Sequence, residues 1–130
     1  MHLYCSTSGG SFDHFWLNEP LPFNQYDGKK IHVICKHPGL RFEKTGHLLA
    51  GSRPEGGGYV TIQVPLPGGM TPPSHEPPSR FGWEVVPSSV RFDCLRIALD
   101  SEAIRSIRPV SSENCDYEIR IPPEAFLEMR

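Results

Sequence analysis

The sequence predicts a mainly β fold: a small single domain of short antiparallel strands, with one or two short helices and a long loop rich in proline and glycine. An α+β arrangement is the alternative. The first observation is that 14 prolines and 12 glycines are spread over 130 residues. Proline removes a backbone donor and glycine raises the entropic cost of ordering, so both end regular elements early. The second is the alternation of apolar and polar residues with period two in several short segments. This length favours one domain over residues 1–130.

Two runs of residues give the clearest strand signals. Residues 31–35 are rich in β-branched side chains and are followed by the turn signal Pro38-Gly39. Residues 59–64 alternate, so a half-buried strand with one polar face is expected there. Residues 40–44 also alternate and suit a hairpin arm that ends at the break Lys44-Thr45-Gly46. The expected strands together cover residues 2–5, 30–36, 59–64, 82–86, 90–99 and 117–121.

Helices are expected to be short and few. Asp100 or Ser101 is suited to cap a helix that runs to about residue 107. Pro123 occupies a position where proline favours the opening of a helix, which predicts a second one over residues 124–129. Residues 65–80 contain six prolines and show no periodicity, so a long irregular loop is expected there.

Composition excludes several classes of function. Thirteen basic and fifteen acidic residues give a net charge of −2 without a basic stripe, which argues against a nucleic-acid partner. No apolar run is long enough to span a bilayer, so no membrane association is expected. The N-terminus lacks the pattern of a secretory signal, which favours a cytoplasmic protein.

The cysteines indicate reduced thiols without a cofactor or a metal. None of the four belongs to a Cys-x-x-Cys pair, and the histidines on the 31–37 segment lack the usual ligand spacing of zinc sites. The cysteines are interpreted as mostly buried small hydrophobes, and His32 and His37 are interpreted as surface imidazoles. The four cysteines are Cys5, Cys35, Cys94 and Cys115.

An acidic pair precedes the last expected strand and has two interpretations. Asp116-x-Glu118 leads into the apolar run 119–121 and then into two prolines. This arrangement resembles the last strand of the mono-ADP-ribosyltransferases, where a Glu-x-Glu or Gln-x-Glu pair stands at this place. The resemblance implies NAD as cofactor and Glu118 as the residue that polarises a ribose hydroxyl. The other interpretation is the exposed face of an alternating strand.

Aromatic and proline-rich segments are the candidates for partner binding. Residues 12–26 carry many aromatic rings, and residues 65–80 form the proline-rich loop, which loses little entropy on docking. Large rings are also needed to fill a small core, so burial is the competing interpretation. The candidate binding residues are Trp16, Phe23, Tyr26, His75, Arg80, Phe81 and Trp83.

The sequence therefore predicts a non-enzymatic module that binds and occludes a protein partner, as immunity-type and phage-type inhibitors do. The analogy rests on small size and compactness rather than on a sequence match. An ADP-ribosyltransferase-like enzyme that uses Glu118 is the first alternative. A small-molecule-binding β-barrel is the second.

Overall fold

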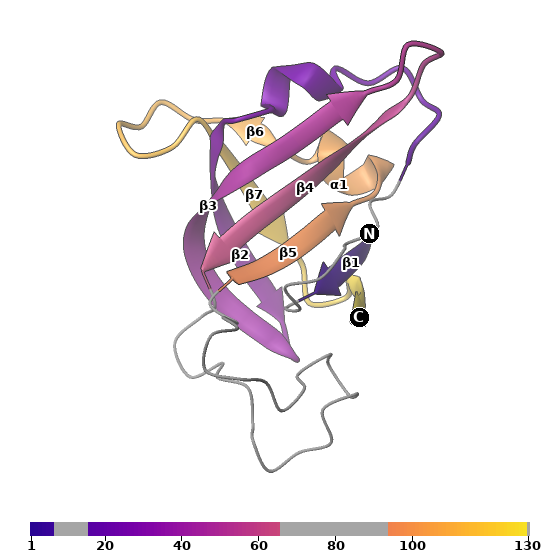
Figure 1. The fold of residues 1–130 in the computed structure, drawn as a ribbon. Coiled ribbons are helices and arrows are strands. Elements are labelled where there is room, and N and C mark those ends of the chain that lie inside the picture. Colours follow the sequence, from indigo (N-terminus) through magenta and orange to yellow (C-terminus); the bar gives the residue numbers. More distant parts are fainter. Residues whose placement is uncertain (7–15, 66–93, 130) are drawn as a thin grey trace, which may run out of the picture.

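One sheet contains most of the residues that this computed structural model describes, namely 1–6, 16–65 and 94–129 (Figure 1). Its strands follow the order β6-β7-β2-β3-β4-β5-β1-β8. The strands are β1 (His2–Ser6), β2 (Lys30–His37), β3 (Leu40–Ser52), β4 (Gly58–Pro65), β5 (Cys94–Leu99), β6 (Arg108–Pro109), β7 (Tyr117–Ile121) and β8 (Phe126–Met129). Two short helices, the 3-10 helix η1 (Phe23–Tyr26) and α1 (Ser101–Arg105), complete the described elements. The expected mainly β fold with short helices is confirmed.

The sheet mixes antiparallel and parallel pairings. Strands β2 to β5 form an antiparallel meander, and β1 adds to β5 in the antiparallel sense. In contrast, β7 pairs with β2 and β8 pairs with β1 in parallel. Both parallel partners come from the C-terminal part of the chain and join strands from the N-terminal part.

The connection between β7 and β8 forces the sheet to curl. Only residues 122–125 separate these strands in the chain, although six inter-strand spacings separate them in the sheet order. In a flat sheet that separation is about 29 Å, at roughly 4.8 Å per spacing. Five residue steps reach at most about 18 Å. The sheet therefore closes on itself far enough to enclose a core.

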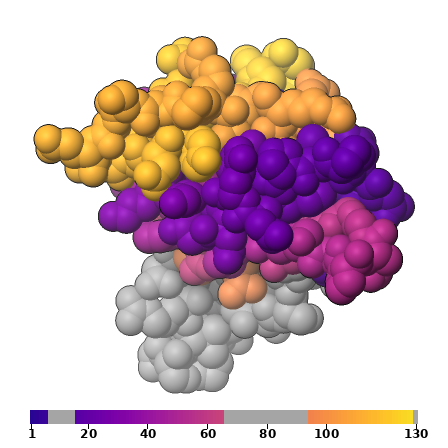
Figure 2. Space-filling model, turned by 90° about the horizontal axis from the view of Figure 1, so that it is seen from above, coloured from indigo at the N-terminus to yellow at the C-terminus, as the bar shows by residue number. Residues whose placement is uncertain are grey.

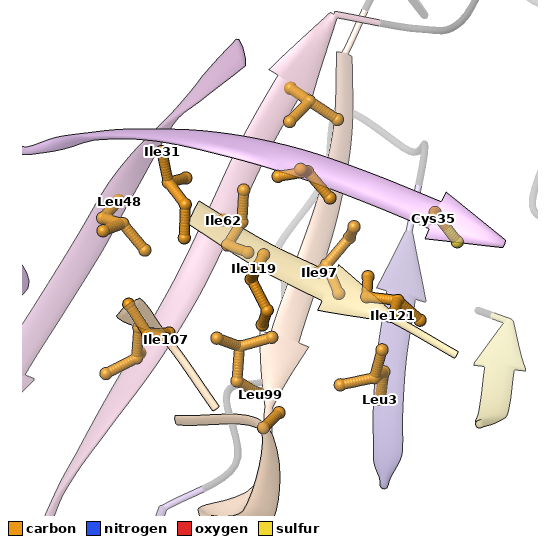
Figure 3. Close-up of a cluster of buried hydrophobic side chains, with 14 of the residues drawn as sticks. Leu3, Ile31, Cys35, Leu48, Ile62, Ile97, Leu99, Ile107, Ile119 and Ile121 are labelled. Atoms are coloured by element: carbon orange, nitrogen blue, oxygen red, sulfur yellow. The ribbon is translucent and has the colours of Figure 1, made fainter. Parts of the chain in front are cut away.

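The core consists of side chains from alternate positions of these strands. In Figure 3, Ile119 and Ile121 of β7 point toward Leu3 of β1 and Leu99 of β5. All four are fully buried or nearly so. Alternation along a strand sends the residues between them to the outer face. On β7, that outer face carries Glu118 and Arg120.

Strand β3 changes partners along its length and needs a glycine to do so. Residues 40–47 pair with β2, whereas residues 47–52 pair with β4. A Cβ on Gly46 would lie 2.5 Å from the Gln63 carbonyl oxygen and 2.3 Å from Cγ1 of Val64. The sequence predicts a break at this glycine, but the strand runs through it because Gly46 pairs with Ile31 of β2, and the absence of a Cβ leaves room for β4.

The expected helix over residues 124–129 is wrong. Residues 126–129 form β8, and the amide of Phe126 donates a 2.8 Å hydrogen bond to the carbonyl oxygen of Met1. Pairing with β1 supplies more partners than one isolated helical turn can, so tertiary contacts override the local preference.

The expected helix after Asp100 is confirmed as α1. The Asp100 carboxylate accepts hydrogen bonds from the amides of Ala103 (2.8 Å) and His2 (2.6 Å). The first bond caps the helix, and the second ties it to β1. Among the described residues, no helix has the length and apolar character needed to cross a lipid bilayer.

The strands expected at 2–5, 30–36, 59–64 and 117–121 are present, with one residue added at some ends. The strand expected at 90–99 is described from residue 94 onward. The strand expected at 82–86 and residues 66–80 of the proline-rich loop lie outside the described residues.

Replacement of Gly46 by alanine tests the close approach of β3 and β4 at this position. The added methyl meets backbone, which cannot yield cheaply, so we expect Gly46→Ala to lower the free energy of unfolding by about 1–3 kcal/mol. Gly39→Ala is the matched control, because its Cβ meets only the His37 ring at 3.3 Å. Urea unfolding should separate the two variants, and equal midpoints would contradict the role given to Gly46.

Candidate functional site

Glu118 lies in the middle of a polar row on the outer face of the sheet. It stands opposite His32 of β2, and His32 stands opposite Thr45 of β3. On the other side, Glu118 is paired with Arg108 of β6. The row exists because β7 lies parallel to β2, which brings side chains from four separate segments of the chain together.

Two arginines hold the Glu118 carboxylate. Nη2 of Arg108 donates to Oε2 at 3.0 Å, and Nε of Arg120 donates to the same oxygen at 3.3 Å. The hydrogen bond from Arg108, aided by Arg120, holds the pKa of Glu118 below its usual value, although partial burial opposes this shift. The carboxylate is therefore ionised at neutral pH. Its second oxygen, Oε1, has no hydrogen-bond partner among the described residues.

A cavity of about 350 Å³ opens beside this carboxylate. One wall is the outer face of β7, β2 and β3, and the other is the loop between β6 and β7. Figure 2 shows this loop as the orange-yellow projection at the left edge of the molecule. The lining residues are His32, Thr45, Val110, Ser112, Asn114, Cys115 and Glu118.

Hydrogen bonds fix the polar side chains of the cavity wall. Nε2 of His32 lies 3.0 Å from a Glu43 oxygen, and Nδ1 lies 3.3 Å from Oγ1 of Thr45. A carboxylate only accepts, so Nε2 carries a proton that points to Glu43. In the loop, the amide of Asn114 donates to Oγ of Ser112 at 3.2 Å.

Asp116 has a structural role and does not line the cavity. Its Oδ2 accepts a 3.0 Å hydrogen bond from the amide of Lys30, and its own amide donates to the Lys30 carbonyl oxygen at 2.9 Å. Its carbonyl oxygen accepts from the amide of Val110 at 3.0 Å. Asp116 thus anchors the base of the loop, whereas Glu118 alone of the acidic pair lines the cavity.

A second candidate site lies at the turn that joins β3 and β4. The Trp16 and Tyr59 rings meet edge to face with centroids 5.0 Å apart, and Cζ of Arg53 lies 3.8 Å from the centroid of the Trp16 ring. Trp16 is 46% exposed, and Leu49, farther along the outer face of β3, is 40% exposed. We call Trp16, Arg53 and Tyr59 the hairpin-end cluster.

The backbone around this cluster is held rigidly. The amide of Leu17 donates to the Gly58 carbonyl oxygen at 2.8 Å, and the amide of Gly58 donates to the Leu17 carbonyl oxygen at 2.9 Å. Gly57 has a φ of +81°, and a Cβ there would lie 2.2 Å from the Leu17 carbonyl oxygen. This glycine lets the segment that carries Trp16 pack directly against the turn.

The residues predicted to bind a partner lie in different parts of the molecule. Phe23 and Tyr26 of η1 are buried in the core, as the competing interpretation holds, so they are corrected from binding anchors to core residues. Trp16 is half exposed and remains a candidate. His75, Arg80, Phe81 and Trp83 lie outside the described residues. Sequence reasoning missed Arg53 and Tyr59, which meet Trp16 only through the hairpin.

The four cysteines fall into two classes. Cys5 and Cys35 are buried, whereas Cys94 and Cys115 are partly exposed, and all four are free thiols in the structure. Burial raises the pKa of Cys5 to about 12 and raises the pKa of Cys35 as well. Within residues 1–6, 16–65 and 94–129, no group of three His, Cys, Asp or Glu side chains is placed to hold a metal ion.

Comparisons with known proteins assign no relative to this chain. No family model matches it, and neither a curated protein nor a solved structure matches it. The function is therefore argued from the geometry of the two candidate sites. Figures 1 and 2 place the β6–β7 loop and the β3–β4 hairpin on opposite sides of the molecule, so the two sites are separable by mutation.

Thiol labelling tests the burial of the cysteines. At pH 8 we expect a maleimide reagent to modify Cys94 and Cys115 in the folded protein, because the thiolate reacts and the pKa of Cys5 and Cys35 is raised. Denaturation without reductant should release four reactive thiols, which peptide mass spectrometry can assign. Rapid labelling of Cys5 in the folded protein, or fewer than four thiols after denaturation, would contradict the assignment.

Proposed function

We propose that this protein is a non-enzymatic module that binds a protein partner through the hairpin-end cluster and occludes part of the partner's surface. The observation that carries the proposal is the exposed Trp16 ring, stacked by Arg53 and packed against Tyr59. Tryptophan, tyrosine and arginine are the residues most enriched at the energetic centres of protein interfaces.

The apolar surface around the cluster supports this assignment. Among the described residues, the exposed large hydrophobic side chains are Trp16, Leu49 and Phe126. Tyr59 contacts Trp16 and pairs with Gly51, and Leu49 lies two residues before Gly51 on the same outer face. The Tyr59 ring fills the space over Gly51, where a Cβ would lie 3.0 Å from it. The cluster thus presents an exposed ring with a cation stacked on it, and a second exposed apolar side chain lies on the same face of β3.

The rigidity of the cluster favours binding over a purely structural role. Two backbone hydrogen bonds and a glycine at positive φ hold Leu17, the residue after Trp16, against the start of β4. A partner therefore meets rings that are already ordered and loses less conformational entropy on association. A small domain with such a preset surface suits the immunity-type or phage-type inhibitor that the sequence predicts. The proposal places it in the cytoplasm, where reduced cysteines are usual.

Truncation of Trp16 tests the binding proposal. We expect Trp16→Ala to weaken association with the partner by about 2 kcal/mol or more, which is roughly 30-fold in Kd. The partner is captured from the host with the tagged parent protein, purified, and its Kd measured by interferometry. Arg53→Ala should weaken association by a smaller factor, because an exposed cation–π contact contributes about 0.5–1 kcal/mol.

Phe126→Ala is the matched control for this measurement. Phe126 is 59% exposed and lies on β8, away from the hairpin, so its truncation removes a similar apolar area from another surface. The control should bind as well as the parent protein. A Trp16→Ala protein that folds and binds with the parental Kd would contradict the proposal.

A transferase is the second candidate, and Glu118 is the observation that favours it. Its carboxylate is kept ionised by two arginines and presents Oε1 beside a cavity. The resemblance to mono-ADP-ribosyltransferases implies a carboxylate at this place that polarises a ribose hydroxyl.

Glu118→Gln separates the transferase from the binding module. If the protein is a transferase, NAD consumption should fall to background in the variant, while its melting temperature stays close to that of the parent. If the protein is a binding module, neither protein should consume NAD, and the Kd for the partner should be unchanged. NAD turnover by the parent that vanishes in Glu118→Gln would favour the transferase.

A further inference from the structure

We infer that the cavity beside Glu118 binds a neutral, polyhydroxylated small molecule of about the size of one monosaccharide ring. The inference does not depend on the proposed protein-binding function, since the β6–β7 loop that lines the cavity lies on the opposite side of the molecule from the β3–β4 hairpin (Figures 1 and 2). It rests on the hydrogen-bonding groups, the charge and the volume of the cavity.

The cavity offers both donors and acceptors in neutral groups and one fixed carboxylate oxygen. The ionised Glu118 carboxylate can only accept, and its Oε1 is left for a ligand because both arginine bonds end on Oε2. Oγ of Ser112 accepts from the amide of Asn114 and so keeps its own proton for a ligand. The Asn114 side chain supplies an amide donor and a carbonyl acceptor. A hydroxyl group both donates and accepts, so a ligand with several hydroxyls matches this set.

The balance of charge argues against a strongly charged ligand. Two carboxylates, Glu118 and Glu43, and two guanidinium groups, Arg108 and Arg120, balance in formal charge around the cavity, and His32 is hydrogen-bonded to Glu43. Arg108 and Arg120 are more than 60% exposed and are not among the lining residues, so, among the described residues, Glu118 is the one lining residue of the Asp, Glu, Lys or Arg type. An anion meets the Glu118 carboxylate, and a cation meets the surrounding guanidinium groups. Neither sign gains net attraction.

The size and the apolar part of the wall suit a single ring. A volume of about 350 Å³ equals roughly a dozen waters, at about 30 Å³ for each in the liquid. Val110 and the His32 ring supply apolar surface on which the C–H groups of a sugar can pack. Hydroxyls on the ring edge then reach Ser112, Asn114 and Glu118.

The test measures binding of three neutral probes to the full chain: D-glucose, D-ribose and myo-inositol. Tetrahydropyran, a ring of similar shape without hydroxyls, is the apolar control, and glucosamine and glucose 6-phosphate are the charged controls. We expect at least one neutral probe to bind and to shift backbone amide NMR signals within residues 110–118. The same probe should slow maleimide labelling of Cys115, while labelling of Cys94, which is outside the cavity, stays unchanged.

Two neighbouring serines provide matched variants. Ser112→Ala removes a lining hydroxyl and should weaken binding about five-fold, the usual effect of one neutral hydrogen bond. Ser111→Ala removes a hydroxyl from the same exposed loop but not from the cavity wall, and should leave the affinity unchanged. Val110→Phe should abolish binding by filling the cavity, with circular dichroism to confirm the fold.

Several results would overturn the inference. One is that no neutral probe binds at concentrations up to about 50 mM, which corresponds to very weak affinity. Another is that tetrahydropyran binds as well as the neutral probes, or that only the charged probes bind. A third is that Ser112→Ala and Ser111→Ala have equal affinities. Because NAD turnover and partner binding are not read out here, failure of this inference is distinct from failure of either function above.

Discussion

Four residues join β7 to β8, and this short connection constrains everything else in the sheet. The two strands lie at positions two and eight of the sheet order, a separation that a connection of this length cannot span in a flat sheet. The curl that follows turns one face of every long strand inward. Isoleucine and leucine side chains from β1, β5 and β7 then meet in one core (Figure 3). The outer face is left to polar residues and to the candidate sites.

The parallel pairing of β7 with β2 determines what the outer face can do. It sets Glu118 beside His32, and the antiparallel neighbour β3 adds Thr45 to the same row. The loop that leads into β7 is then held over this row by Asp116, whose carboxylate and backbone both bond to Lys30. The cavity is thus a consequence of strand order and not of any local motif.

Local sequence patterns predict some elements of the fold correctly. The alternation in residues 117–121 predicts β7 with its observed bounds, and Asp100 correctly marks the start of α1. Local pattern fails where distant backbone decides the outcome. Gly46 lies inside β3 because it pairs with β2 and leaves room for β4, and residues 126–129 form a strand because they pair with β1.

The same limit applies to the candidate sites. Glu118 and Trp16 attract attention in the sequence because of their residue type and context. Their partners do not, because His32 is 86 positions from Glu118 and Tyr59 is 43 positions from Trp16, and only the pairing of strands brings them together. Phe23 and Tyr26 show the opposite case. They share the aromatic segment with Trp16, yet η1 turns both rings into the core.

Strand β3 contributes to both sites and also keeps them independent. Thr45 lines the cavity near the middle of the strand, and Arg53 follows its last residue at the hairpin. Between them, the strand is bonded to β2 and then to β4, and Leu48 and Ala50 anchor it in the core. A side-chain change at either site is therefore separated from the other site by a densely packed segment of the strand. For this reason, variants of the hairpin-end cluster serve as controls for ligand binding in the cavity, and variants of the cavity serve as controls for partner binding at the hairpin.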